Sequence, residues 1–279
     1  MIAQDDKKAW VERSIITKFR KTIWAPFLEA LRVYKLVSEG DKIAVCISGG
    51  KDAMLLAKLF QELKRHSEVE FGVEYICMDP GYNEENAKKI EYNAALLGVP
   101  IKFFKSDVFE AASIVGGESP CYMCARMRRG YLYARAHELG CNKIALGHHR
   151  SDVIETTLMG MFYGGQIQGM MPRIRSANFQ GMELIRPMYC ISEEDIAHWR
   201  DYNGLEFIAC ACSFTARLQQ NGQGRSVRQE MKELVKELKK RNPDVEKSIF
   251  KSIHNVQLDT LPGYKTGQTR HSFLERFED

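Results

Sequence analysis

The chain has 279 residues, of which 44% are hydrophobic and 27% are charged, and its formal net charge is +4 at pH 7. A chain of this size and composition can bury a substantial core, and no apolar run approaches the roughly 18 residues that a membrane span needs. The opening residues, MIAQDDKKAW, lack the apolar stretch and the small-residue cleavage site of a signal peptide. These features argue against a membrane protein and predict a cytoplasmic one.

The positive charge is concentrated in two segments. Residues 7–42 carry nine Lys or Arg against four Asp or Glu, and residues 225–241 carry seven against three. Two such segments on either side of a near-neutral middle could hold the phosphate backbone of a nucleic acid. Two solvated helix faces would give the same counts, so charge alone leaves both interpretations open.

Hydrophobic periodicity predicts a helical region first and then alternating strands and helices. Apolar residues at helical spacing indicate helix over residues 11–38, which Pro26 should kink or divide. The strands that we expect next cover residues 42–48, 69–78, 101–104 and 143–146, and the helices between and after them start near residue 52 or cover residues 84–97, 125–139 and 153–162. This order is typical of βαβ units and predicts an α/β fold with a mainly parallel sheet.

The last third of the chain shows weaker patterns. Residues 164–172 suggest a loop, and Ser192 begins a capping-box pattern for a helix that runs to about Tyr202. We expect a last strand at residues 205–209 and an amphipathic helix at residues 227–240. The tail from about His254 shows little periodicity, and we expect it to be partly disordered.

The first expected strand leads into the string Ser48-Gly49-Gly50-Lys51-Asp52-Ala53. Paired glycines allow the backbone to approach a phosphate, and the start of the following helix supplies free N–H donors and a positive dipole end. Ser48 adds a hydroxyl donor, and the carboxylate of Asp52 suits a Mg²⁺ ion held against phosphates. The string therefore predicts a nucleotide-binding loop rather than a simple turn.

Some of the eight cysteines are spaced as metal ligands are. In a reducing cytosol, close spacing points to metal binding or catalysis rather than to disulfides. Cys121 and Cys124 form a CxxC pair, and Cys210 and Cys212 are separated by one residue. Apolar runs surround Cys46, Cys77 and Cys141, which we interpret as small core residues.

Several strings together carry a family resemblance. SGGKD at residues 48–52 resembles the SGGxDS signature of the PP-loop ATP pyrophosphatases. Four further strings follow in order: CYMCARMRRG at residues 121–130, KIALGHHRSD at 143–152, MFYGGQIQGMMP at 161–172 and IRP at 185–187. With these strings, the chain closely resembles the tRNA 2-thiocytidine synthetase family. The resemblance runs from about Gly40 to Arg241.

This resemblance implies a fold and an activity. The fold would be a parallel-sheet PP-loop domain of the adenine nucleotide alpha hydrolase (Rossmann-like) type over residues 41–210, with a helical region at residues 1–40 and a helix and tail at residues 211–279. The implied activity is ATP-dependent thiolation of the cytidine at tRNA position 32 through an adenylated intermediate. Sulfur would come from a cysteine desulfurase, and a homodimer is compatible with the family.

The resemblance also implies a [4Fe–4S] cluster held by three cysteines. Cys121 and Cys124 would supply two ligands, and the third would be Cys212 or Cys210, with a slight preference for Cys212. A structural zinc site is the competing interpretation, because all four of these cysteines would complete its usual ligand number.

Roles for individual residues follow from the same resemblance. Gly147 and His148 would lie beside the ATP, Asp52 would hold Mg²⁺, and Arg128 would be a basic catalytic residue. Two positions depart from the family pattern: Ala53 replaces the last Ser of SGGxDS, and Ser151 replaces the first Asp of GHHRDD. Asp152 is therefore the remaining acid that we assign to Mg²⁺ or to proton transfer.

Two other functions stay open at this stage. One is a PP-loop sulfur transferase that acts on another tRNA base or on a small molecule. The departures at Ala53 and Ser151 would favour that alternative. The other is a non-catalytic sensor that binds a nucleotide or a cluster and in which the altered motifs have lost turnover.

Overall fold

The computed structural model describes residues 4–106, 120–208 and 226–276, with the side chains of residues 4, 5 and 120–125 excepted. The chain divides into two compact units. Unit 1 comprises Met1–Val153 and Met170–Arg225, and unit 2 comprises Ile154–Gly169 and Ser226–Asp279. Helix α7 (Arg150–Phe162) runs across the division between them.

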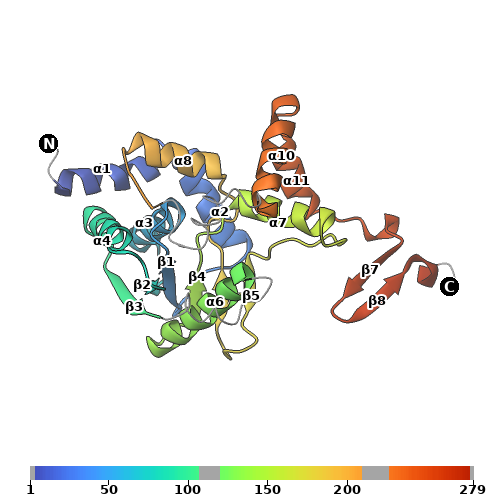
Figure 1. The fold of residues 1–279 in the computed structure, drawn as a ribbon, viewed down its shortest axis with the longest axis horizontal. Helices are drawn as coiled ribbons and strands as arrows, with labels where there is room; N and C mark the ends of the chain where they lie inside the picture. The colour runs from blue at the N-terminus through green and yellow to red at the C-terminus, as the bar shows by residue number, and fades with distance from the viewer. Residues whose placement is uncertain (1–3, 107–119, 209–225, 277–279) are drawn as a thin grey trace. The chain divides into compact units, whose positions relative to one another are not determined.

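A six-stranded sheet forms the centre of unit 1 (Figure 1). The order across the sheet is β3-β2-β1-β4-β6-β5, and all neighbouring pairs are parallel except β5 with β6. The strands are β1 (Lys42–Ile47), β2 (Gly72–Asp79), β3 (Ile101–Lys105), β4 (Lys143–Ala145), β5 (Arg173–Arg175) and β6 (Glu183–Ile185). The predicted α/β fold with a mainly parallel sheet is confirmed.

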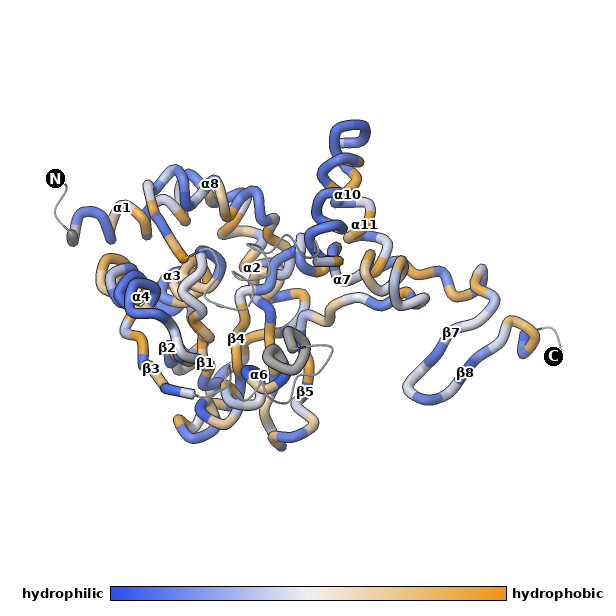
Figure 2. Tube along the Cα trace, viewed as in Figure 1, coloured by the Kyte–Doolittle hydropathy of each residue, from blue (hydrophilic) through white to orange (hydrophobic). Residues whose placement is uncertain are grey.

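Helices cover both faces of this sheet. Right-handed crossovers from β1 to β2 and from β2 to β3 run in one direction across the sheet, and the crossover from β3 to β4 runs in the other, so their helices lie on opposite faces. These helices are α3 (Lys51–His66), α4 (Glu84–Leu97) and α6 (Pro120–Glu138). Residues of β1 on one face, Ala44 and Cys46, belong to a buried cluster with Tyr133 and Ala136 of α6. Burial on both faces explains why β1 is apolar after Lys42, and Figure 2 shows hydrophobic colours over most of the strand.

The N-terminal region is helical, as predicted, but it is divided earlier than Pro26. Helix α1 (Gln4–Ile16) is followed by a π-helical turn at Arg20–Trp24 and by α2 (Ala25–Val33), in whose first turn Pro26 lies. The first turn of a helix tolerates proline, because the backbone N–H groups of that turn have no partner within the helix and the N–H that proline lacks is therefore not needed.

Helix α1 is tied to α3 by a buried ion pair. The ammonium group of Lys58 is fully buried and donates to Glu12 of α1 at 2.6 Å, to Gln61 and to the carbonyl of Leu97. Arg65 also donates to Glu12, at 2.8 Å. The N-terminal region is therefore part of the core of unit 1.

The strand that we expected in the later part of the chain is wrong. Residues 205–208 form no strand, because Phe207 stacks on Trp199 and the carbonyl of Glu206 accepts a hydrogen bond from Asn93 of α4; Ala209 lies outside the described residues. The sheet is instead completed by β5 and β6, which are too short for periodicity to reveal. The tail also contains ordered structure.

Unit 2 has its own small core and a hairpin. Helices α10 (Val227–Arg241) and α11 (Val245–Ser252) bury Met231 and Val235 against Ile154 and Leu158 of α7. A hairpin of β7 (Gly263–Thr266) and β8 (Thr269–Ser272) follows in the tail, where we expected partial disorder. Gly267, at φ +60°, occupies its turn, so the hairpin had a local signal that helical periodicity does not detect. None of the helices in the described part of the chain is long and apolar enough to cross a membrane.

Candidate nucleotide and sulfur-transfer site

The strand order identifies one edge of the sheet as the place for a ligand. From β1 the chain moves outward to β2 and β3, and it then returns to the other side of β1 to form β4. In open parallel sheets, ligands bind outside the carboxyl ends of the strands where the direction of the connections reverses. The string at residues 48–53 follows β1, and Gly147 and His148 follow β4, so two of the predicted motifs meet at this point.

The loop after β1 has a shape that requires glycine at position 49 but not at position 50. Gly49 has a φ of +81°, and a Cβ atom there would lie 2.5 Å from Cγ1 of Ile90 and 2.7 Å from Cδ1 of Ile208. Gly50 has an ordinary extended conformation, and the nearest atom to a Cβ there would be Oγ of Ser48 at 3.7 Å. Gly49 is thus required by packing, whereas the space above Gly50 is open at the start of α3.

The segment after β4 packs directly on this loop. A Cβ atom at Gly147 would lie 3.1 Å from the carbonyl carbon of Asp52 and 3.2 Å from the amide nitrogen of Ala53. Because both neighbours are backbone atoms, they cannot move aside as a flexible side chain would. Gly147 is therefore what allows the two motifs to touch. Ala53, where the family pattern has Ser, is only 4% exposed at this contact.

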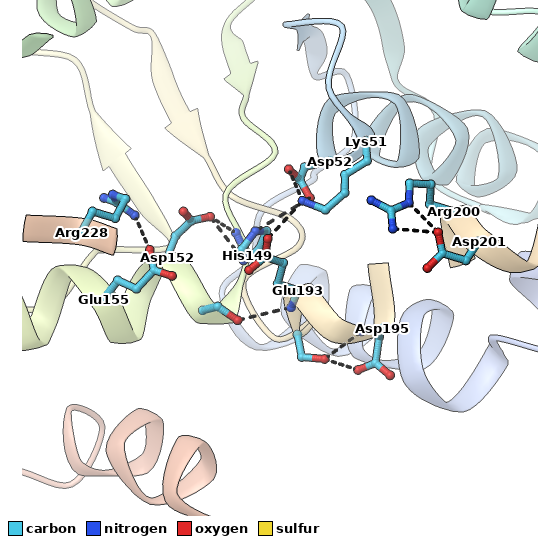
Figure 3. Close-up of polar contacts among 12 residues, drawn as sticks. Lys51, Asp52, His149, Asp152, Glu155, Glu193, Asp195, Arg200, Asp201 and Arg228 are labelled. Atoms are coloured by element: carbon cyan, nitrogen blue, oxygen red, sulfur yellow. Dashed lines mark hydrogen bonds and ion pairs between the residues drawn. The ribbon is translucent and has the colours of Figure 1, made fainter. Parts of the chain in front are cut away.

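His149 connects the two acidic residues of the site (Figure 3). Its backbone N–H donates to Oδ2 of Asp152 at 2.9 Å, and its Nδ1 lies 3.4 Å from the same oxygen. Its Nε2 lies 3.8 Å from Oδ1 of Asp52. His149 is buried, at 6% exposed, and lies between two carboxylates whose side chains are 30% and 20% exposed.

Asp52 has an oxygen that suits a cation. Its Oδ1 is buried and accepts no hydrogen bond from the described residues, although the ammonium group of Lys51 lies 3.2 Å away. A buried carboxylate oxygen without a hydrogen bond is costly unless a cation occupies the site. The donor type and the position beside the open start of α3 therefore fit Mg²⁺ bound to nucleotide phosphates.

Lys51 is held between two carboxylates. Its ammonium group lies 3.3 Å from Oε1 of Glu193, the first residue of α8 (Glu193–Tyr202), in addition to its contact with Asp52. Burial opposes the charged form, but the charges and hydrogen bonds of Asp52 and Glu193 outweigh it and raise the pKa of Lys51. Lys51 is thus a fixed positive charge at the start of α3, where an anionic ligand would need one.

Ser151 has a structural contact that bears on its departure from the family pattern. Its Oγ accepts a hydrogen bond of 3.3 Å from the backbone N–H of Glu193. The neighbouring Ser192 caps the same helix by accepting from the N–H of Asp195 at 3.1 Å. Ser151 therefore helps to fix the helix end that presents Glu193 to Lys51.

Arg128 of α6 acts on the carboxyl ends of β1 and β2. Its positive charge opposes the effect of burial, which raises the pKa of Cys77 to about 12 and also raises the pKa of Cys46 and Tyr82. Arg128 is partly buried and lies four residues, or about one helical turn, after Cys124. The charge of Arg128 therefore acts on groups in and just after β1 and β2, and its catalytic role stays a prediction.

The cysteines predicted to hold a cluster lie in α6 and in the segment after Ile208. The backbone of Cys121 and Cys124 belongs to the first turns of α6, but their side chains, and all of Cys210 and Cys212, lie outside the described residues. The segment that leads to the second pair passes the loop after β1, because Ile208 lies against Gly49.

The other four cysteines belong to no group of three or more metal-binding side chains in the described part of the chain. Burial raises the pKa of each thiol, to about 12 for Cys77 and to about 11 for Cys141 and Cys190. Cys46, Cys77 and Cys141 are buried core residues, as predicted.

Comparison with known proteins agrees with the fold and the site described above. The PP-loop domain family matches residues 21–231. The tRNA-cytidine(32) 2-sulfurtransferase of Syntrophotalea carbinolica is 37% identical over 234 residues, which cover 82% of this chain and 86% of that protein. The chain belongs to this sulfurtransferase family of PP-loop proteins. The enzyme of the same name from Cellvibrio japonicus is 34% identical, with 90% of this chain and 81% of that protein covered.

A solved structure supports the fold independently. The U34-tRNA thiolase NcsA of Methanococcus maripaludis, solved with its [4Fe–4S] cluster, matches with a TM-score of 0.65 over 88% of this chain and 84% of that one. The sequences are only 18% identical, so the match establishes the PP-loop fold with its helical additions and no residue roles.

The sequence did not single out two residues of this edge. Glu193 was noticed only as part of a helix cap, and Arg186 only as part of the IRP string. Each of the two contacts residues that are distant in the sequence, and only the folded sheet brings those residues together.

Proposed function

We propose that this chain is an ATP-dependent tRNA sulfurtransferase that thiolates the cytidine at position 32 of tRNA. The observation that carries the proposal is the meeting of Asp52, His149 and Asp152 at the open start of α3, in a chain that belongs to a family of tRNA-cytidine(32) 2-sulfurtransferases. The U34-tRNA thiolase match supports the same class of reaction at the level of fold.

The residues of the site suit adenylation. ATP would place its phosphates above Gly50, where the backbone N–H groups at the start of α3 and the charge of Lys51 stabilise negative charge. The cytidine O2 would attack the α-phosphate, and pyrophosphate would leave. The poor leaving oxygen of the base would thereby become part of AMP, which sulfur can displace at C2.

A Mg²⁺ ion and an iron–sulfur cluster would complete the proposed site. Asp52 would hold Mg²⁺, and Asp152 would share that task or accept a proton, with His149 keeping the two acids in place. Cys121, Cys124 and either Cys212 or Cys210 would hold a [4Fe–4S] cluster, which supplies the sulfur chemistry when it is bound. Arg128 would neutralise negative charge that develops on the activated substrate.

The proposal extends to partners and organisation. The sulfur would come from a cysteine desulfurase, the enzyme would act in the cytoplasm, and the active form could be a homodimer. Residues 1–40, 41–210 and 211–279 would be the helical region, the catalytic domain and the C-terminal helix and tail. The basic segments at residues 7–42 and 225–241 would contact the tRNA backbone.

Nucleoside analysis of tRNA tests the assigned base. We expect tRNA from cells that lack this gene to lose 2-thiocytidine at position 32, and a plasmid copy of the gene to restore it. Loss of a different thionucleoside would transfer the assignment to another base. No change in any thionucleoside would favour the sensor.

The colour of the protein tests the cluster. Anaerobically purified protein should be brown and absorb near ~400 nm, as thiolate-bound iron–sulfur centres do. Cys121→Ala should remove this absorbance, whereas Cys190→Ala, which alters a cysteine outside the predicted ligand set, should keep it. A colourless protein with stoichiometric zinc would overturn the assignment.

A further inference from the structure

A pair of stacked aromatic rings joins α1 to the end of α8, two helices that lie side by side in Figure 1. The ring of Trp10 stacks on the ring of Tyr202, with the centroids 5.8 Å apart and an angle of 14° between the planes. The buried ring of Phe19 meets Tyr202 edge to face at 5.6 Å. Phe19 thus anchors the pair to the core of unit 1.

Both stacked rings remain open to solvent. Trp10 is 52% exposed and Tyr202 is 46% exposed, whereas the other two tryptophans of the chain, Trp24 and Trp199, are 8% and 0% exposed. Large aromatic side chains stabilise a fold by burying their rings, and these two rings forgo much of that stabilisation. The exposed pair therefore has the character of a contact surface.

The exposed charge beside this pair is mostly positive. Over residues 6–21, the exposed charged side chains are one acid and four cations, namely Asp6, Arg13, Lys18, Arg20 and Lys21. Among the described residues, no carboxylate lies within ion-pair distance of these four cations. Glu12, in the same stretch, is already engaged by Lys58 and Arg65. The four positive charges are therefore available to an anionic ligand.

Three of these cations adjoin the aromatic pair. Arg13 follows Trp10 by three residues, which places it on the same face of α1. Lys18 and Arg20 flank Phe19, whose ring touches Tyr202. We call this combination of exposed rings and cations the α1–α8 surface, and its residues are Trp10, Arg13, Lys18, Arg20 and Tyr202.

Helix α8 connects the α1–α8 surface to the loop after β1. Glu193, the first residue of α8, lies 3.3 Å from the ammonium group of Lys51, and Tyr202 is the last residue of the same helix. At 1.5 Å per residue, these two ends of α8 are about 14 Å apart. A polynucleotide with one nucleotide at the site can extend over that distance.

We propose that the α1–α8 surface binds unpaired nucleotides of the tRNA substrate, with a base stacked on Trp10 and phosphates beside the cations. This inference rests on the proposed function, in which the modified cytidine belongs to the single-stranded anticodon loop of tRNA. Aromatic rings next to cations are the usual means by which proteins bind single-stranded nucleic acid. A paired stem presents no free base face to such a ring, so the surface favours the loop.

Tryptophan fluorescence reports on this surface, because Trp10 is the exposed one of the three tryptophans. The probes are an RNA hairpin with the sequence of the anticodon stem and loop, and a fully paired RNA duplex of the same length. We expect the hairpin to quench the fluorescence and the duplex to leave it nearly unchanged. Trp10→Phe should abolish the quenching but keep the hairpin affinity within about threefold, since phenylalanine retains a ring for stacking.

Filter binding measures how much the surface contributes to affinity. Trp10→Ala should weaken hairpin binding by about tenfold, as the loss of one stacked base does. Arg13→Gln should weaken it by a similar factor, and the slope of log affinity against log salt should become smaller by about one.

Two other variants serve as matched controls. Tyr92 of α4 is a 61% exposed ring, but the neighbouring Lys88 and Lys89 are paired with carboxylates. Arg175 of β5 is a guanidinium whose side chain is 92% exposed. Tyr92→Ala and Arg175→Gln should each change the hairpin affinity by less than about twofold.

Folded Trp10→Ala protein that binds the hairpin as tightly as the parent would overturn the α1–α8 surface. Quenching by ATP alone would also overturn it, because Trp10 would then contact the nucleotide rather than RNA. These measurements need neither the cluster nor turnover, so the surface can fail while the parent protein still thiolates tRNA. Failure of the proposed function would instead appear as tRNA that binds at this surface and is not thiolated.

Discussion

The backbone of Gly147 lies against the backbone of Asp52, so close that a Cβ atom on Gly147 would be 3.1 Å from the Asp52 carbonyl carbon. This contact joins the segment after β4 to the loop after β1, and it holds Asp152 and Asp52 on either side of His149. The geometry of the site therefore depends on a residue that takes no part in the chemistry.

Gly147→Ala tests that dependence. The added methyl group should push the two segments apart, weaken ATP binding by about tenfold and cost about 1–3 kcal/mol of stability through overpacking. Gly130→Ala is the control, because a Cβ atom at Gly130 of α6 meets nothing within 4 Å, and it should leave both properties unchanged or raise stability slightly. Equal ATP affinity in the Gly147 variant and the parent would show that the contact is not needed.

Gly50→Val should abolish nucleotide binding and leave the fold intact. No protein atom lies closer than 3.7 Å to a Cβ atom at Gly50. The valine side chain would therefore fit without disturbing its neighbours, but it would occupy the space that the phosphates need. Gly49→Val should instead destabilise the fold, because Gly49 combines a φ of +81° with contacts to Ile90. Calorimetric titration with ATP and thermal unfolding separate the two effects. An unchanged ATP affinity in the Gly50 variant would mean that the loop is only a turn.

Asp52→Asn should damage Mg²⁺-dependent turnover and leave ATP affinity nearly intact. The amide keeps the shape of the side chain but weakens the binding of a cation at Oδ1, so pyrophosphate release with tRNA should fall by at least about tenfold. Asp201→Asn is the control, because Asp201 is an exposed acid of α8 whose partner is Arg200. Full turnover by the Asp52 variant at all Mg²⁺ concentrations would remove Asp52 from the metal site.

Glu12→Gln should lower the free energy of unfolding by about 3 kcal/mol at pH 7, because it leaves Lys58 buried without an anion. Glu84→Gln removes the exposed partner of Lys88 and should cost less than about 1 kcal/mol. Denaturant titrations measure both values. A cost for Glu12→Gln as small as that for Glu84→Gln would contradict the role of the buried pair.

The cost of Glu12→Gln should also depend on pH. Burial opposes the ionisation of Glu12, but hydrogen bonds from Arg65 and Lys58 lower its pKa below the ordinary value of 4.5. A lowered carboxyl pKa gives stability that is present above pH 4.5 and is lost as the pH falls through the folded value. The difference between parent and variant should therefore shrink below about pH 4.5.

The sequence was a good guide wherever a single segment carried the signal. The predicted boundaries of α4 match the structure, and the string at residues 48–53 lies at the strand-to-helix junction expected of it. The predictions from the sequence failed where tertiary contacts determine the local structure. Three of the four residues 205–208 are apolar, as in a strand, but Phe207 stacks on Trp199 instead. Strand β6 has three residues, too few for periodicity. Glu193 reaches Lys51 only because α8 folds back to α3.

Thiolation by the purified protein tests the central claim most directly. Protein with its cluster reconstituted is incubated with ATP, Mg²⁺, sulfide and unmodified tRNA, and the nucleosides are analysed by mass spectrometry. We predict 2-thiocytidine at position 32, formed with release of pyrophosphate and lost in Cys121→Ala. Protein that carries an intact cluster and binds both ATP and tRNA, yet yields no thiolated nucleoside, would contradict the account.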